Sequence, residues 1–413
     1  MKFNKWTVGL AAAGVVSLAS VAQAEEKKST VETALSHTVI SGYVDTSFIY
    51  RTGGGNGTIP GRSYDQGGGG LGPTFSNPLN KQDGFNLNVV KLTIEKPVDE
   101  GQWAAGYKVD LLYGPDANVY NTASLGVTAQ DFAIKQAYVA LRVPVGNGLD
   151  LKVGVFDTII GYEVFEAGNN PNYSRSYGFF LEPNTYTGVL ASYRICDMIA
   201  VSGGVANTPT VVGPVPGLAV GNTINGRQAA SNSRFSYMGS VALTAPESTG
   251  FLKGSTLYAG FVGASQPVVG GPSSDRINLY VGGTIKTPVE GLSVGAAWDH
   301  VYNGVSEGSY ADALALYVSF QATEKMRLNV RGEYTAATAG TYTGVKSGVN
   351  DEKFISVVGT VDYSLWANVI TRLEARYDQD ASGGADPYNI GSSSGGGPEN
   401  YAFSLALNVI YKF

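Results

Sequence analysis

The sequence predicts an all-β protein, a transmembrane up-and-down antiparallel β-barrel of about sixteen strands with long extracellular loops and short periplasmic turns. Three observations lead to this prediction. Apolar and polar residues alternate with a period of two through most of the chain, the connections between these stretches are long and short in turn, and the chain starts like an exported protein. Beyond that start, no stretch is apolar for the ~18 residues that a membrane-spanning helix needs.

The first residues have the features of a secretory signal peptide. Lys2 and Lys5 precede an apolar run over residues 6–18, and Ala22-Gln23-Ala24 forms a small-residue cleavage site. The apolar run is shorter than the ~20 residues of a spanning helix, so an uncleaved anchor is disfavoured. The expected organisation is a signal peptide over residues 1–24, a short periplasmic lead over 25–36 and an outer-membrane barrel over 37–413.

The connections between the alternating stretches fall into two classes. The long ones cover residues 52–84, 114–131, 157–185, 207–234, 265–276, 302–310, 337–351 and 379–400. The short ones cover residues 97–102, 144–148, 196–197, 246–253, 288–291, 322–325 and 364–367. Such an arrangement is typical of outer-membrane barrels, with loops outside and turns in the periplasm. An even number of strands then puts both chain ends in the periplasm.

Charged residues share one face of each predicted strand. In residues 326–334, Leu328 and Val330 alternate with Arg327 and Arg331, which predicts lipid on one side and a wet interior on the other. The predicted pore-lining residues are Lys108, Asp110, Arg142, Asp150, Lys152, Arg194, Arg327, Arg331, Glu333, Arg372, Glu374 and Arg376. The same parity predicts that Leu328→Arg destabilises the barrel and that Arg331→Leu is tolerated. A soluble barrel, with the two faces exchanged, is the alternative.

The last strand, residues 401–413, has a continuous apolar face that ends on an aromatic residue. Phe403, Leu405, Leu407, Val409, Tyr411 and Phe413 lie on that face. This ending resembles the signal that outer-membrane barrels present to the barrel-assembly machinery. Tyr411 and Phe413 are therefore the expected assembly signal.

The third long connection, over residues 157–185, is unusually aromatic for a surface loop. Its predicted functional residues are Tyr162, Glu163, Glu166, Tyr173, Arg175, Tyr177, Phe179 and Phe180. A barrel of this size encloses an aqueous channel, so we expect the loop to fold into the lumen and constrict it. The alternative is packing over the outer rim or against a sister subunit.

Residues suited to catalysis or metal binding are few. His37 and His300 are the only histidines and Cys196 is the only cysteine, and no serine lies in a nucleophile motif, so no catalytic residue and no cofactor is expected. Asp378, Asp380 and Asp386 partly match a calcium loop that lacks its closing Glu. A solvated acidic loop is the alternative. The net charge of −6 argues against nucleic acid as a partner.

Several segments resemble one known family. Residues 42–47 read GYVDTS, residues 108–118 read KVDLLYGPDAN, and residues 135–190 contain KQAYV, PVGNGLDLKVGVFDT, IGYEVFE and NPNYSRSYGFF. Over this first half the chain resembles the OmpL-like outer-membrane β-barrel porins, also called porin-2. The resemblance implies a porin in the bacterial outer membrane and does not extend to a particular solute.

Together these observations predict a passive diffusion channel for small hydrophilic solutes. Eight cations and four acids in the predicted lining favour a weak preference for anions. The alternatives are a structural or adhesive barrel with a plugged lumen, or an outer-membrane hydrolase that uses His300. The expected partners are outer-membrane lipid, the barrel-assembly machinery and the solutes, and the assembly is left open between monomer and homotrimer.

Overall fold

The computed structural model describes residues 37–51, 81, 84–99, 103–120, 131–207, 210–211, 235–266, 274–303, 308–342, 351–383 and 400–413. The expected signal peptide and periplasmic lead, residues 1–36, lie outside these ranges. The strands are β1 (Val39–Arg51), β2 (Gly84–Lys96), β3 (Ala105–Tyr113), β4 (Phe132–Val143), β5 (Leu149–Asp157), β6 (Pro183–Arg194), β7 (Ile199–Ala206), β8 (Thr210–Val211), β9 (Ser236–Thr244), β10 (Thr256–Gln266), β11 (Ser274–Lys286), β12 (Leu292–Tyr302), β13 (Tyr310–Gln321), β14 (Met326–Ala337), β15 (Glu352–Trp366), β16 (Val369–Asp380) and β17 (Tyr401–Lys412). The helical elements are α3 (Pro115–Tyr120), η3 (Ala167–Asn169), α4 (Tyr177–Leu181) and η4 (Glu247–Leu252).

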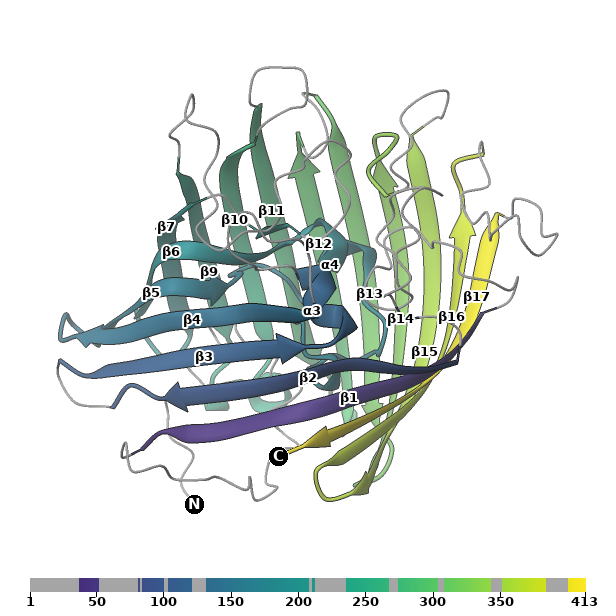
Figure 1. The fold of residues 1–413 in the computed structure, drawn as a ribbon, viewed down its shortest axis with the longest axis horizontal. Helices are drawn as coiled ribbons and strands as arrows, with labels where there is room; N and C mark the ends of the chain where they lie inside the picture. The colour runs from purple at the N-terminus through teal and green to yellow at the C-terminus, as the bar shows by residue number, and fades with distance from the viewer. Residues whose placement is uncertain are drawn as a thin grey trace.

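The long strands close into an antiparallel barrel of 16 strands, which confirms the predicted fold class. Each pairs with its neighbours in sequence, β7 pairs directly with β9, and β1 pairs with both β2 and β17. The two-residue β8 lies against β6. Closure pairs both edges of each long strand, as a membrane requires. In Figure 1 the strands β1–β5 run across the direction of β11–β16, because tilted strands on two walls of a barrel cross in projection.

The alternation of long and short connections is also present. All seven short connections join strands at the end of the barrel where β1 begins and β17 ends. One predicted turn was misplaced: residues 364–366 belong to β15, which has a register shift between Ser364 and Trp366. The actual turn is at residues 367–368, and Asn368 has a φ of 64° there. Asparagine tolerates this left-handed conformation better than most residues.

The outer face of the barrel is apolar and the inner face is polar. Leu328 and Val330 are 38% and 50% exposed on the outside, whereas Arg331, the next residue of β14, is 0% exposed. The parity predicted from the sequence is therefore correct, and the inverted, soluble arrangement is excluded. Exposed aromatic side chains near the strand ends include Tyr50, Trp103, Tyr113, Trp366, Tyr377 and Tyr411. Such aromatic girdles occur at the two interfaces of outer-membrane barrels.

The carboxy-terminal residue closes the seam between the first and last strands. The backbone N–H of Phe413 donates to Gly42 O and that of Gly42 donates to Phe413 O, both at 2.9 Å. A Cβ built on Gly42 would lie 2.7 Å from the Phe413 ring and 2.2 Å from the backbone oxygen of Lys91. Only glycine leaves room for the aromatic terminus at this position.

Candidate functional site in the barrel lumen

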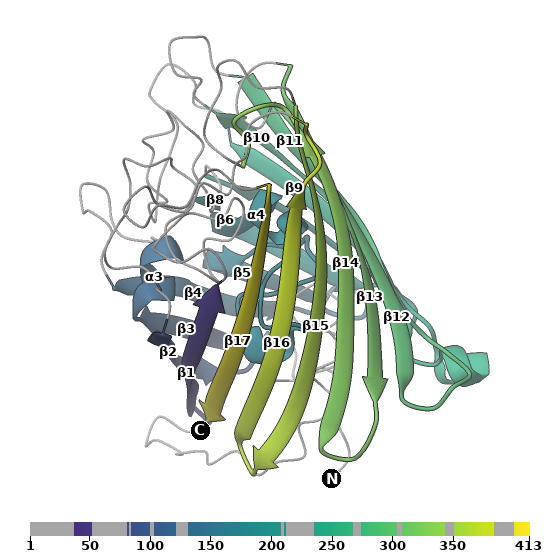
Figure 2. The same ribbon diagram turned by 90° about the vertical axis from the view of Figure 1, so that its right-hand side faces the viewer.

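The connection between β5 and β6, residues 158–182, runs through the inside of the barrel. We call it the lumen segment. It carries η3 and α4, and α4 lies within the barrel outline in both views (Figures 1 and 2). Every residue from 170 to 186 is buried. Ser176 caps α4 by accepting a hydrogen bond from the backbone N–H of Phe179 at 3.1 Å.

Apolar side chains of the lumen segment pack against three parts of the inner wall. Phe165, Tyr173 and Phe179 join a cluster with Tyr43, Ile49, Val89, Leu112, Ala406 and Ile410. Tyr177, Phe180 and Leu181 join a second cluster with Val301, Tyr342 and Phe354. Ile159 and Ile160 join a third with Phe156, Tyr186, Met238, Val262 and Tyr280. Since a disordered surface loop would leave these aromatics in water, their burial explains the aromatic composition that the sequence shows.

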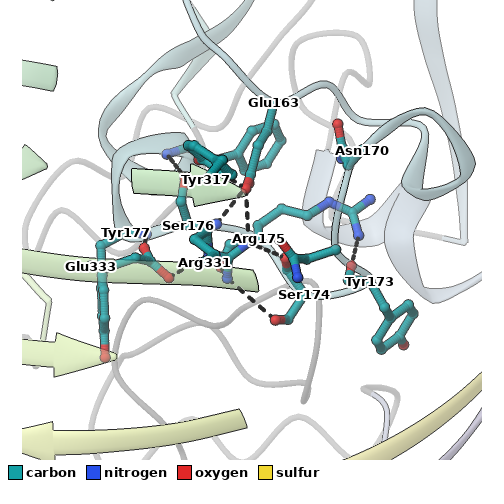
Figure 3. A network of polar contacts seen from close by, with 12 residues as sticks. Glu163, Asn170, Tyr173, Ser174, Arg175, Ser176, Tyr177, Tyr317, Arg331 and Glu333 are labelled. Carbon is teal, nitrogen blue, oxygen red and sulfur yellow. Dashed lines mark hydrogen bonds and ion pairs between the residues drawn. The ribbon is translucent and has the colours of Figure 1, made fainter. Parts of the chain in front are cut away.

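Arg331 of β14 is the central polar contact of the lumen segment (Figure 3). Its Nη1 donates to Glu163 Oε1 at 2.8 Å and to the backbone oxygen of Ser174 at 2.6 Å. Its Nε donates to Glu333 Oε1 at 2.6 Å, and its Nη2 donates to the backbone oxygen of Arg175 at 2.9 Å. Charge-assisted bonds of this kind are about twice as strong as neutral ones. One buried guanidinium therefore links two carboxylates and two loop carbonyls.

Acidic wall residues bind the backbone N–H groups of the same stretch. Glu374 accepts from the N–H of Tyr173 at 2.6 Å and from that of Ser174 at 3.0 Å. Glu333 accepts from the N–H of Tyr177 at 2.7 Å. Because irregular backbone within a membrane protein must find partners in the protein, these carboxylates allow the lumen segment to remain inside the barrel.

Two further arginines complete the docking. Arg372 donates to the backbone oxygens of Ala167 and Asn170, the latter at 3.1 Å. Arg376 donates to the backbone oxygen of Arg175 at 2.7 Å. Both side chains are buried. Arginines of β14 and β16 thus donate hydrogen bonds to backbone carbonyl groups of the lumen segment.

The opposite wall holds the lumen segment through Glu166. Its carboxylate accepts from Lys91 Nζ of β2 at 2.5 Å and lies 3.4 Å from Lys135 Nζ of β4. Burial alone would raise the pKa of Glu166, but the two ammonium groups outweigh it and hold that pKa below its ordinary value. The lumen segment is therefore attached to both sides of the barrel and crosses the lumen between them.

These contacts correct part of the predicted pore lining. Seven of the predicted residues point inward but are buried, namely Asp110, Arg142, Arg331, Glu333, Arg372, Glu374 and Arg376. They hold the lumen segment or neighbouring wall groups and do not line open water. Strand parity fixes which face is inside, but it contains no information about what else occupies the inside.

Arg142 and the other predicted lining residues lie nearer the short turns. Arg142 forms a two-point pair with Asp150 at 2.7 and 2.6 Å, Lys108 lies 3.2 Å from Glu95, and Arg194 lies 3.1 Å from Asp197. Arg327 is partly buried, and its Nε donates to Gln321 Oε1 at 3.3 Å. Most of these cations therefore have a polar or acidic neighbour.

Two lysines on the inner face form no ion pair within the described ranges. Lys152 of β5 lies over the Tyr138 ring at 5.0 Å. Lys286 of β11 was not among the residues predicted from the sequence. It lies two residues from Thr284, whose hydroxyl is 2.8 Å from that of Tyr162 in the lumen segment. Alternation through residues 274–286 was the signal that could have identified it. Both lysines are half-buried.

The candidate calcium ligands Asp378 and Asp380 do not lie in a loop. Asp378 and Asp380 belong to β16 and not to a loop, because the strand continues to residue 380. Asp378 is fully buried and binds Arg376 through both carboxylate oxygens at 3.0 Å, so it is already neutralised. Asp386 lies outside the described residues. Among the residues that are described, no group of three metal-binding side chains occurs.

His300 lies between Trp298 and Tyr302, both exposed on the outer face. Its Nδ1 is 2.9 Å from Asp312 Oδ1 of β13, and the Trp298 indole N–H donates to the same oxygen at 3.2 Å. The hydrolase alternative required a serine beside His300, whereas its hydrogen-bond partner in the described ranges is this aspartate. None of the described helices is both long and apolar enough to cross a bilayer.

A closed 16-stranded barrel with an apolar belt and a loop folded into its lumen defines the class of outer-membrane porins. The chain belongs to the family described as beta-barrel porin-2, OmpL-like, whose model matches residues 37–413. It is accordingly an outer-membrane channel for small solutes. None of the curated proteins matches the sequence.

Solved porin structures share the fold at low sequence identity. The anion-selective porin from Comamonas acidovorans is 11% identical with a TM-score of 0.57, covering 91% of this chain and 99% of that one. The outer membrane channel DcaP of Acinetobacter baumannii is also 11% identical with a TM-score of 0.57, covering 93% and 99%. The trimer form of OmpT from Vibrio cholerae is 12% identical with a TM-score of 0.52, covering 91% and 99%.

Proposed function

We propose that the protein is a passive diffusion porin whose conducting cross-section is set by the lumen segment. The observation that supports this most is the attachment of residues 158–182 to both walls, through Arg331 on one side and Glu166 on the other. A segment anchored at two opposite places narrows the path between them. The channel performs no chemistry on its solutes, and it assembles after export through a cleaved signal peptide and a terminal strand signal at Tyr411 and Phe413.

The proposed solutes are small and hydrophilic, with a weak preference for anions. The predicted basis for this preference was the excess of eight cations over four acids in the lining, but Arg331, Arg372 and Arg376 are buried. The support now comes from Lys152 and Lys286, which face the lumen without an acidic partner in the described part of the chain. A wall charge acts over a Debye length of ~8 Å, so these two lysines favour anions near the short-turn end. The Comamonas porin of similar fold is anion-selective.

A plugged structural barrel is the second candidate, favoured by the complete burial of residues 170–186. The two candidates differ in conductance. The test is to insert purified full-length protein into planar lipid bilayers and record single channels, then to measure the reversal potential across a salt gradient. The porin proposal predicts discrete conductance steps and a reversal potential on the anion side. A folded protein that inserts without conducting would favour the plugged barrel.

We also propose a homotrimeric assembly. The support is the similarity in fold to OmpT, which has been solved in a trimer form. Size-exclusion chromatography with light scattering on detergent-solubilised protein separates a trimer from a monomer.

A further inference from the structure

A row of three polar side chains crosses the inner wall at the short-turn end of β11, β12 and β13. Lys286 lies opposite Ser293 in the register of β11 and β12, and Ser293 lies opposite Ser319 in that of β12 and β13. Adjacent strands are about 4.8 Å apart, so the three residues are direct neighbours. We call them the Lys286 row. Their chain neighbours exposed on the outer face are Ile285, Val294 and Val318.

The lumen segment covers the next row of the wall through Tyr162. This ring stacks on Tyr317 with centroids 4.1 Å apart, and its hydroxyl is 2.8 Å from that of Thr284. A Cβ on Gly295 would lie 2.2 Å from the same phenol oxygen. Thr284, Gly295 and Tyr317 are paired across β11–β13, two residues farther from the short turns than the Lys286 row. The Lys286 row therefore lies just below the lumen segment, and its members are only partly buried.

The positive charge of the Lys286 row is not neutralised by the wall around it. The inward positions of β11–β13 in this part of the barrel contain no acid, being Thr284, Lys286, Ser293, Gly295, Tyr317, Ser319 and Gln321. Asp362 of β15 is already bound by Arg372 at 2.8 Å. Glu290 is exposed in the adjoining turn, and no ion pair joins it to Lys286 among the described residues. The ammonium group is thus available to a solute anion.

The donors of the Lys286 row fit an anion that has several oxygens. An ammonium has three N–H donors, and each serine hydroxyl has one O–H donor. In the part of the chain that the structure describes, neither the Ser293 nor the Ser319 hydroxyl forms a hydrogen bond. Donors on adjacent strands can reach separate oxygens of a carboxylate or a phosphate, and charge-assisted bonds of this kind are the strong ones. A chloride ion offers a single acceptor atom instead.

Lys152 on β5 has the same charge without these hydroxyl neighbours. It lies opposite Ala140 on one side and Leu190 on the other, and its ammonium lies over the Tyr138 ring. Lys152 therefore attracts anions through its charge, whereas Lys286 also has hydrogen-bond donors directly beside it. The difference between the two lysines makes the effect of the serines measurable.

We propose that the Lys286 row is a binding site for small oxyanions, carboxylates or phosphate, at the short-turn end of the lumen. Binding there distinguishes oxyanions from chloride, which charge alone does not. The effect on channel current rests on the proposed function, whereas the binding itself does not.

The test uses purified full-length protein at constant pH and ionic strength. Phosphorus NMR line broadening of inorganic phosphate gives its dissociation constant, and acetate is then added as a competitor. Single-channel current carried by chloride is recorded before and after phosphate is added. Lys286→Gln removes the charge, and Ser293→Ala with Ser319→Ala removes only the hydroxyls. Lys152→Gln keeps the whole row, and Lys253→Gln, exposed in the turn after β9, is the matched control. Heat-modifiable migration checks that each variant is folded.

Phosphate should bind wild type and reduce the chloride current until the site is saturated. Lys286→Gln should weaken phosphate binding about tenfold, because a hydrogen bond from a charged donor is lost. The double serine variant should weaken it about fivefold. Lys152→Gln and Lys253→Gln should bind phosphate as wild type does. Acetate should displace phosphate from wild type.

Two results would overturn the proposal. One is phosphate binding in Lys286→Gln that equals that of wild type. The other is wild-type binding in the double serine variant, which would leave a charge effect without a site. Acetate that fails to displace phosphate would refute the part of the proposal that concerns carboxylates. Phosphate binding that depends on the Lys286 row in a protein that carries no current would support the site and refute the channel.

Discussion

Strand parity and the structure predict different effects of Arg331→Leu on the stability of the barrel. Parity places Arg331 in water and predicts that Arg331→Leu is tolerated. In the structure its guanidinium is 0% exposed and neutralises Glu163 and Glu333. The leucine would leave two buried carboxylates without their cation. We expect a loss of stability that is larger than for the lipid-facing Leu328→Arg.

The magnitude follows from the contacts. Removing one partner of a buried ion pair costs about 3–5 kcal/mol, and Arg331 also donates to the backbone oxygens of Ser174 and Arg175. Arginine placed on the lipid face near the bilayer midplane costs about 2–4 kcal/mol. The expected order of destabilisation is therefore Arg331→Leu first and Leu328→Arg second, the reverse of the prediction from parity alone.

Urea unfolding of protein refolded in lipid vesicles measures both values. Arg327→Leu is the matched control, since Arg327 lies on the same inner face of β14 next to the short turn, and its Nε donates to Gln321 Oε1 at 3.3 Å. We expect its cost to be smaller than that of Arg331→Leu. Equal, small effects of the two arginine substitutions would refute the conclusion that the wall arginine anchors the lumen segment.

Two other substitutions test separate parts of the molecule. Deleting Phe413 removes the two backbone hydrogen bonds and the ring that close the seam at Gly42. The folded, heat-modifiable band in membrane fractions should therefore decrease while export continues. An unchanged band would contradict the assembly role. Replacing Lys152 and Lys286 together by glutamine should shift the reversal potential in a salt gradient toward the value of a cation-selective channel. An unchanged reversal potential would mean that neither lysine faces the narrow part of the channel.

The barrel could be predicted from the sequence because its signals are local. A period of two places Leu328 and Arg331 on opposite faces whatever the rest of the chain does, and short turns such as 144–148 identify themselves by composition. The aromatic content of residues 157–185 was sufficient to predict a loop folded into the lumen. One turn was misplaced because β15 continues through an irregular register to Trp366.

The contacts inside the barrel could not be predicted because they join residues far apart in the chain. Arg331 and Glu163 are 168 residues apart in the sequence. The alternation of apolar and polar residues gives no information about contacts over such a separation. The wall arginines were therefore assigned to open water, and Asp378 was considered as a calcium ligand when its partner is Arg376.

The constriction itself is tested most directly by shortening the lumen segment. In this variant residues 164–179 are replaced by a short glycine-serine link, and folding is checked first by heat-modifiable migration. Single-channel conductance in planar bilayers is then compared with wild type under identical salt. We expect a clearly larger conductance, because the variant lacks the part of the lumen segment that lies between β2 and β4 on one side and β14 on the other. An unchanged conductance in a folded barrel would show that residues 158–182 do not limit the channel.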